Sequence, residues 1–149
     1  MSATADEAQR LADRVVGKLM RADAFSHWLG VEVLETAPRG STIRMTVRDE
    51  MVNGFGTAHG GIVFSLADSA FAFACNAQGR LSVAVDCTVS YPVAVRPGDV
   101  LTAVAVEETS TNRLAFCTVT VRNQDEIVVG LFRGTVYRTT QEHFPATAT

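Results

Sequence analysis

The segment that decides the fold spans residues 53–76 and reads NGFGTAHGGIVFSLADSAFAFACN. From residue 62 onward it is almost entirely apolar or small, with Phe64, Phe71 and Phe73 set among alanines and a single charge. A helix that is apolar nearly all round is buried nearly all round. We therefore predict a central, buried helix over about 60–77.

The segments around this helix have the pattern of β-strands. Ile43, Met45 and Val47 alternate with polar residues, and the other candidates are rich in β-branched side chains. Short turns, among them a type II turn at Pro97-Gly98, imply antiparallel hairpins. The predicted strands span 31–37, 41–48, 81–91, 99–109, 113–123 and 126–138. The sequence thus predicts an α+β fold in which an antiparallel sheet wraps one central helix.

The N-terminal region has helical character. Leu11, Val15 and Leu19 recur at helical spacing, which predicts an amphipathic helix over about 5–21. A short turn follows and is closed by Gly30. We expect three side chains of this turn to pack against the core: Phe25, Trp28 and Leu29.

Length and composition limit the function classes. The 149 residues are 47% hydrophobic, which suits one domain over 1–149 with flexible tails at about 1–5 and 139–149. A net charge of -3 argues against nucleic acid or an anionic membrane as a partner. No apolar run approaches the roughly 18 residues of a membrane-spanning helix. Three cysteines without a secretion signal predict reduced thiols and a cytoplasmic location.

The charge inside the predicted helix is Asp68. An ionised carboxylate in apolar surroundings costs several kcal/mol unless it is paired or hydrogen-bonded. Its helical neighbours, among them Ser65 and Ala72, include no cation. Two interpretations follow: Asp68 meets an arginine of the sheet or solvent, or it is a reactive carboxylate whose pKa is tuned by burial.

Two glycines, Gly60 and Gly61, stand where this helix should begin. The first N–H groups of a helix lack intrahelical partners, and glycine lets a ligand approach them. Such donors suit a developing oxyanion, although a plain loop-to-helix turn has the same composition. Gly60 and Asp68 are eight residues apart, about 12 Å along a helix. Either they serve different purposes, or one site is shared by two subunits.

Residues 51–79, MVNGFGTAHGGIVFSLADSAFAFACNAQG, closely resemble the PaaI-type acyl-CoA thioesterases of the hotdog fold, and LFRGTVYR at 131–138 resembles their last strand. The resemblance implies a curved antiparallel sheet around one helix. It also implies a homodimer with shared active sites, commonly paired again into a homotetramer. The implied substrates are aryl-acetyl thioesters such as hydroxyphenylacetyl-CoA, as in phenylacetic acid degradation. Coenzyme A is then part of the substrate, and no cofactor is expected.

The resemblance also implies roles for individual residues. Asp68 matches the catalytic carboxylate, as nucleophile or as general base, and the Gly60 amide would polarise the thioester carbonyl. Asn53 would position the carbonyl or the water. His59 either takes part directly or braces the loop. Some relatives carry a serine on the following strand where this chain has Ala84, and Ser82 is a possible substitute.

Other residues would contact the substrate. Phe55 and Gly61 are expected to line the substrate pocket, and arginines near turns suit the phosphates of CoA because the guanidinium donates bidentately. We expect the CoA-binding residues to include Arg96, Asn112, Arg113 and Arg138. His27 and His143 show no metal-ligand spacing, so no metal is expected.

Two other function classes stay open. A hotdog dehydratase or hydratase would use an acid–base pair on a β-hydroxyacyl chain, but the spacing of His59 and Asp68 fits the thioesterase pattern better. A non-catalytic acyl-CoA-binding or sensing module would not need Asp68. Hydrolysis of acyl-CoA, read out as free thiol, separates these classes.

Overall fold

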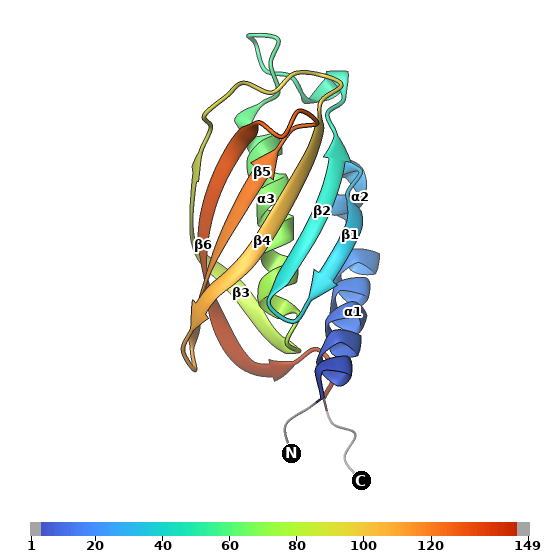
Figure 1. The fold of residues 1–149 in the computed structure, drawn as a ribbon, viewed down its shortest axis with the longest axis vertical. Helices are drawn as coiled ribbons and strands as arrows, with labels where there is room; N and C mark the ends of the chain where they lie inside the picture. The colour runs from blue at the N-terminus through green and yellow to red at the C-terminus, as the bar shows by residue number, and fades with distance from the viewer. Residues whose placement is uncertain (1–3, 146–149) are drawn as a thin grey trace.

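The computed structural model describes residues 4–145 as one curved antiparallel sheet around a central helix (Figure 1). The sheet order is β1-β2-β4-β5-β6-β3. The helices are α1 (Ala5–Ala22), α2 (Ala24–Leu29) and α3 (Gly60–Asn76), with a 3-10 turn at Asp49–Met51. The strands are β1 (Glu32–Ala37), β2 (Gly40–Thr46), β3 (Arg80–Ser90), β4 (Val100–Ser110), β5 (Leu114–Arg122) and β6 (Val128–Glu142). The predicted α+β hotdog architecture is confirmed, with each predicted element present.

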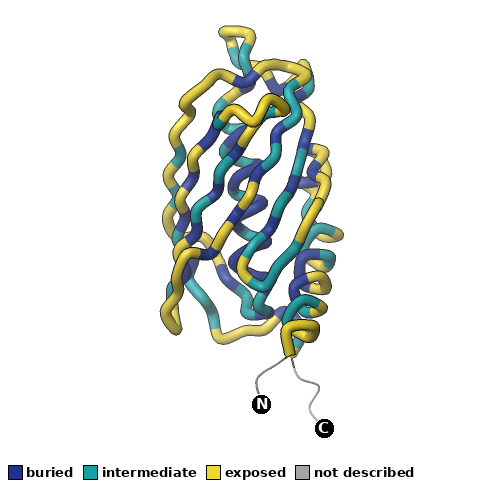
Figure 2. Tube along the Cα trace, viewed as in Figure 1, coloured by how far each residue is buried: buried dark blue, intermediate teal, exposed yellow. Residues whose placement is uncertain are grey.

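The helix α3 forms the centre of the core (Figure 2). Leu66, Phe71 and Phe73 are fully buried, and the Phe71 ring packs on Phe132 of β6 with 5.3 Å between ring centroids. Several alanines of α3 have no exposed surface, which lets the strands approach the helix backbone closely. The apolar composition of this segment is therefore explained by contact with the concave face of the sheet.

One face of α3 is left partly uncovered by its own chain. Gly61, Ser65, Asp68 and Ala72 follow one another at spacings of four, three and four residues, and all are half-buried. Residues at this spacing lie on one face of a helix. We call these four residues the open stripe of α3, and Asp68 lies in its middle.

The strand beside the open stripe, β3, is an edge strand. It pairs with β6 alone, and its other edge has no partner in the described residues. Val83 and Val85 of β3 are 47% and 59% exposed. A long edge strand with exposed apolar side chains is suited to pairing with another chain.

The connection from β3 to β4 differs from the predicted hairpin. The type II turn is present, because Gly98 has a φ of 88° and the Asp99 amide donates to the Arg96 carbonyl at 3.1 Å. However, β4 pairs with β2 and β5, so this turn belongs to a crossover that leaves the edge of β3 free. The hairpin prediction is wrong here because local turn chemistry does not specify which strands pair.

Both ends of the chain also differ from the predicted tails. Thr4 and Glu7 form a capping box at the start of α1. At the other end β6 continues to Glu142, His143 is buried, and the Phe144 ring lies under the guanidinium of Arg14. Residues 139–145 are therefore packed against β3 and α1 and do not form the separate tail that was predicted from residue 139 onward. Residues 1–3 and 146–149 lie outside the described part.

The turn after α1 packs less than predicted. Leu29 is buried, but Phe25 and Trp28 are each about half exposed and stack on one another with 5.9 Å between centroids. Gly30 has a φ of 81° and ends α2 as expected. Two of the three predicted core contacts are thus wrong, because α2 is a short surface helix that turns only one face inward.

We expect the substitution Gly134→Ala to destabilise the fold. A Cβ at Gly134 would lie 2.6 Å from Cζ of Phe71, and that ring is enclosed by the core. Overpacking of this kind costs about 1–3 kcal/mol of unfolding free energy. Urea unfolding at fixed protein concentration measures it. The matched control is Gly54→Ala, where no atom lies within 4 Å, and there the change should stay within about 0.5 kcal/mol. Equal stability of the two variants would contradict the prediction.

Candidate active site

Asp68 lies half-buried on the open stripe without a counter-ion. Within residues 4–145 it forms neither an ion pair nor a side-chain hydrogen bond, so it does not meet an arginine of the sheet. Burial, and secondly the charge of Asp23, raise the pKa of the Asp68 carboxyl above its ordinary value. Burial, and secondly the charge of Asp68, raise the pKa of the Cys87 thiol on β3. A carboxylate whose pKa is raised, as that of Asp68 is, is a stronger base than a solvated carboxylate.

Asp23 is held in place by hydrogen bonds at the start of α2. Its carboxylate accepts from the Ser26 amide at 2.9 Å and from the Ser26 hydroxyl at 2.6 Å. The Ser26 hydroxyl in turn contacts that of Ser69 on α3 at 2.9 Å. This chain of contacts fixes a second negative charge near Asp68. Sequence reasoning missed Asp23, because an Asp three residues before a buried serine indicates only a helix cap.

Gly60 presents a free N–H group at the start of α3. His59 is the N-cap residue: its Nδ1 accepts from the Gly61 amide at 2.9 Å, and its carbonyl accepts from the Ile62 amide at 2.9 Å. The Gly60 amide donates to no group among the described residues. His59 therefore caps the helix, while its direct participation stays a prediction. Gly60 is left as the unpaired donor at the positive end of the helix.

The loop before α3 is organised by Asn53. Its side-chain oxygen accepts from the amides of Phe55 and Thr57 at 2.9 and 3.3 Å, and its Nδ2 donates to the Thr57 hydroxyl at 3.2 Å. Phe55 lies at the tip of this loop and is 92% exposed. Asn53 therefore holds the loop that positions Gly60.

A small cavity of about 280 Å³ lies beside Gly60, between the loop, α3 and the segment after β3. The Tyr91 ring packs on Gly60, so a Cβ there would lie 3.1 Å from the Tyr91 Cζ and 3.3 Å from its hydroxyl oxygen. Burial raises the pKa of Tyr91. This close approach explains why position 60 is a glycine. Sequence reasoning missed Tyr91, because a lone tyrosine at the end of a strand carries no specific signal.

The predicted CoA-binding residues fall into two places. One place is the start of β5, which Asn112 and Arg113 precede. Arg138 of the neighbouring strand β6 lies beside them, and its amide donates to the Arg113 carbonyl at 2.8 Å. Arg80, which sequence reasoning missed, donates from Nη1 to the carbonyl and side-chain oxygens of Asn112 at 2.9 and 3.2 Å. We call Arg80, Arg113 and Arg138 the basic cluster. Arg96 lies at the opposite end of the sheet, in the turn that precedes β4.

The serine suggested as a substitute for the absent water-binding serine lies elsewhere. The Ser82 hydroxyl donates to the Arg80 carbonyl at 3.1 Å, and its amide donates to Asn76 Oδ1 at 2.9 Å. Asn76 is the last residue of α3, eight residues beyond Asp68. Ala84 is exposed on the edge strand. Ser82 therefore does not stand beside the carboxylate.

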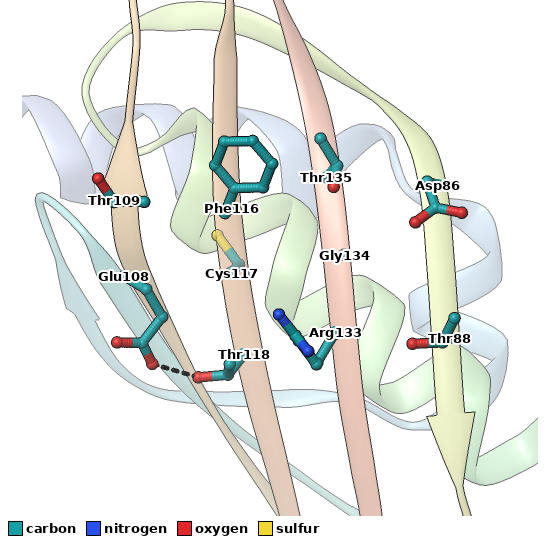
Figure 3. A pocket seen from close by; sticks show the side chains of 10 residues that line it. All are labelled: Asp86, Thr88, Glu108, Thr109, Phe116, Cys117, Thr118, Arg133, Gly134 and Thr135. Carbon is teal, nitrogen blue, oxygen red and sulfur yellow. Dashed lines mark hydrogen bonds between the residues drawn. The ribbon is translucent and has the colours of Figure 1, made fainter.

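A separate hollow of about 480 Å³ lies on the other face of the sheet. Figure 3 shows Phe116, Thr118 and Arg133 pointing away from α3, between Glu108 on β4 and Asp86 on β3. The sheet itself stands between this hollow and Asp68.

In residues 4–145 no three His, Cys, Asp or Glu side chains gather to hold a metal ion. Likewise, no helix of the described chain is long and apolar enough to cross a membrane.

We expect Asp68→Asn to increase the free energy of unfolding at pH 7. A carboxyl whose folded pKa is raised favours the folded state below its unfolded value of 3.8, and this contribution is lost as the pH rises through the folded pKa. The difference between variant and wild type should therefore shrink as the pH falls toward 3.8. Urea unfolding across this range measures it. Asp23→Asn, which can still cap α2, should change stability in the same direction. A less stable Asp68→Asn at pH 7 would show that the carboxylate is paired.

Comparison with known proteins places these features in a family. Residues 55–129 match the model of the thioesterase superfamily. A putative esterase of Archaeoglobus fulgidus is 35% identical over 145 residues, which cover 97% of this chain and 93% of that protein. The acyl-coenzyme A thioesterase PaaI of Escherichia coli is 39% identical over 119 residues, which cover 78% of this chain and 83% of that protein.

A solved structure agrees with these relatives. The E. coli PaaI structure matches with a TM-score of 0.89 and 33% identity, over 91% of this chain and 98% of that one. The residues matched by the family model include Gly60 and the open stripe, in which Asp68 lies. The chain therefore belongs to the thioesterase superfamily, as a hotdog-fold acyl-CoA thioesterase of the PaaI type.

Proposed function

We propose that each active site is shared by two chains, with Gly60 of one chain and Asp68 of a second acting on one thioester carbonyl. The observation that carries this proposal is the separation of the two groups. The free Gly60 N–H and the unpaired Asp68 carboxylate belong to one helix and to residues about 12 Å apart along its axis. One carbonyl cannot contact both within a chain. Two antiparallel helices related by a two-fold axis would bring each Asp68 to the Gly60 of the other chain.

The free surfaces of the chain support a homodimer of this kind. The open stripe of α3 and the unpaired edge of β3 lie next to each other, so a second chain could cover the stripe and pair with the edge together. The other face of the sheet carries four exposed apolar side chains, Val104, Val106, Phe116 and Leu131. These favour further association of two dimers into a homotetramer.

In the proposed reaction Asp68 acts as a general base or as a nucleophile. As a base it takes a proton from water while the water oxygen attacks the thioester carbon, and the carbonyl electron pair moves to oxygen. The Gly60 N–H and the helix dipole stabilise this oxyanion. Collapse of the intermediate expels the thiolate of CoA, which takes up the proton. As a nucleophile Asp68 would instead form an acyl anhydride that water then cleaves. Burial and Asp23 strengthen either role by raising the pKa of Asp68.

We propose aryl-acetyl thioesters of CoA, such as hydroxyphenylacetyl-CoA, as the substrate class. The E. coli PaaI protein with the matching structure comes from the phenylacetic acid degradation operon. Antiparallel pairing would place Arg96 of one chain at the same end as the basic cluster of the second, where CoA phosphates could bind. No cofactor is needed, because CoA belongs to the substrate. A cytoplasmic location stays our expectation from the sequence.

We expect Asp68→Asn to lose nearly all thioester hydrolysis while the dimer stays folded. The near-isosteric amide removes both the base and the nucleophile without opening a cavity. General base catalysis alone contributes about 10²–10⁴-fold. The kcat for an aryl-acetyl-CoA, followed through the released thiol, measures this loss. If the variant keeps more than about a tenth of the wild-type kcat, Asp68 is not the catalytic group.

The shared site is tested by mixing two inactive variants. Gly60→Val places a side chain against Tyr91 and blocks the oxyanion donor, whereas Asp68→Asn removes the base. In a mixed dimer one site carries both defects and the other carries neither. Random exchange of equal amounts should then restore about a quarter of the wild-type activity per chain.

The control for this experiment mixes Asp68→Asn with itself after the same exchange treatment. Mass spectrometry of differently tagged chains confirms that mixed dimers form. Exchange without recovery would place the whole site within one chain. This outcome would overturn the shared site while leaving the role of Asp68 to the previous experiment.

A further inference from the structure

We propose that the Tyr91 hydroxyl is a second oxyanion donor, which acts together with the Gly60 N–H on the carbonyl oxygen of the thioester. This inference rests on the proposed function, because it needs that carbonyl at Gly60. Tyr91 directly follows Ser90, the last residue of β3. The proposal therefore adds a side chain from the segment after β3 to a site that otherwise consists of residues of α3 and of the loop before it.

The start of α3 offers the thioester oxygen one main-chain donor. The Gly61 amide donates to His59 Nδ1 and the Ile62 amide donates to the His59 carbonyl, each at 2.9 Å. Of these first three amides, Gly60 alone has no acceptor within residues 4–145. A carbonyl oxygen has two lone pairs, and the oxygen of the tetrahedral intermediate also carries a negative charge. The helix itself therefore leaves part of this oxygen without a donor.

The cavity beside Gly60 contains two side-chain hydroxyls, those of Thr57 and Tyr91, and its other lining residues are glycine, alanine and valine. The Thr57 hydroxyl accepts from Asn53 Nδ2 at 3.2 Å and donates to Asn53 Oδ1 at 3.4 Å, so it is engaged within the loop. The Tyr91 hydroxyl lies against Gly60 and has no hydrogen-bond partner in the described part of the chain. Tyr91 is thus the side-chain donor that this cavity leaves free.

The two donors are close enough to share one oxygen. An ideal Cβ at Gly60 would lie 3.3 Å from the Tyr91 hydroxyl oxygen, and a Cβ lies about 2.5 Å from the nitrogen of its own residue. The distance from the Gly60 nitrogen to this hydroxyl oxygen therefore cannot exceed about 5.8 Å. Hydrogen bonds of up to about 3 Å on each side can bridge a separation of up to about 6 Å. A single carbonyl oxygen can thus accept from both groups.

The surroundings of Tyr91 keep its hydroxyl a donor. Burial raises the pKa of Tyr91 above its ordinary value of 10.0, so the phenol stays protonated at neutral pH. The residue is 48% exposed, but the hydroxyl end of its ring is turned toward Gly60. In apolar surroundings a hydrogen bond to a developing negative charge is stronger than in water. The valines that line the cavity provide such surroundings: Val63, Val93, Val95 and Val129.

A donor at this position acts on the transition state more than on the bound substrate. The carbonyl oxygen of a thioester is an uncharged acceptor, whereas the same oxygen carries a negative charge in the tetrahedral intermediate. Tyr91 keeps its proton throughout, so it forms and breaks no covalent bond. We therefore expect loss of the hydroxyl to lower kcat and kcat/KM together by about 10- to 100-fold, with KM nearly unchanged.

The first test is Tyr91→Phe, assayed by the release of thiol from an aryl-acetyl-CoA. The remaining ring can still pack on Gly60, so the midpoint of urea unfolding should stay that of the wild type. The matched control is Tyr137→Phe, which removes the other tyrosine hydroxyl of the chain, next to Arg113. Tyr137 does not line the cavity beside Gly60, so the kcat of this variant should equal that of the wild type.

A second measurement reads the hydrogen bonds to the carbonyl without turnover. Asp68→Asn should bind the thioester without hydrolysing it, so difference Raman spectroscopy with an isotope-labelled carbonyl can follow the C=O stretch of the bound substrate. Hydrogen-bond donors lower the frequency of this stretch. Adding Tyr91→Phe to Asp68→Asn should move the band to a higher frequency, whereas adding Tyr137→Phe should leave it in place.

The outcomes separate this inference from the proposed function. A Tyr91→Phe variant with the kcat of the wild type, or with a raised KM alone, overturns the role of the hydroxyl as an oxyanion donor. A lower kcat without a change of the C=O band overturns it too, because Tyr91 would then act without touching the carbonyl. Absence of hydrolysis in the wild type would instead contradict the function itself.

Discussion

The burial of α3 in the concave face of the sheet is the constraint on which the rest of the structure depends. The helix is in contact with all six strands, and Gly134 of β6 leaves room for the Phe71 ring. Because the sheet covers most of the helix but not all of it, one stripe of four residues stays partly open. Because Asp68 lies on this stripe, its carboxylate stays partly exposed and is not enclosed by the sheet.

The candidate site contains two groups that each lack a partner among the described residues. Gly60 offers an N–H group without a partner at the positive end of the helix, and Asp68 carries a charge without a counter-ion in its middle. Asp23, fixed by Ser26, makes the charge of Asp68 still less favourable. Such a carboxylate costs stability in the fold, and this cost is consistent with a group retained for its chemistry.

Much of the fold was predictable from residue patterns, because the relevant interactions are local. Alternation identified β2, an apolar composition identified α3, and Pro97-Gly98 identified a type II turn. The pairing of β3 was not predictable, because the partner of a strand depends on contacts between distant segments. The buried end of the chain was missed for the same reason: His143 is fixed by Asn76 of α3, which is 67 residues away.

Composition and spacing along one segment are enough to predict the central helix, its glycine start and the unpaired Asp68. The neighbours of Asp68, of Gly60 and of the predicted CoA-binding arginines, by contrast, follow from contacts between distant segments. Asp23 reaches it from the α1–α2 junction, Tyr91 closes on Gly60 from the end of β3, and Arg80 joins Arg113 and Arg138 at the edge of the sheet. These neighbours come from separate elements, and no periodicity within one segment encodes a contact that forms only when the sheet curves around the helix.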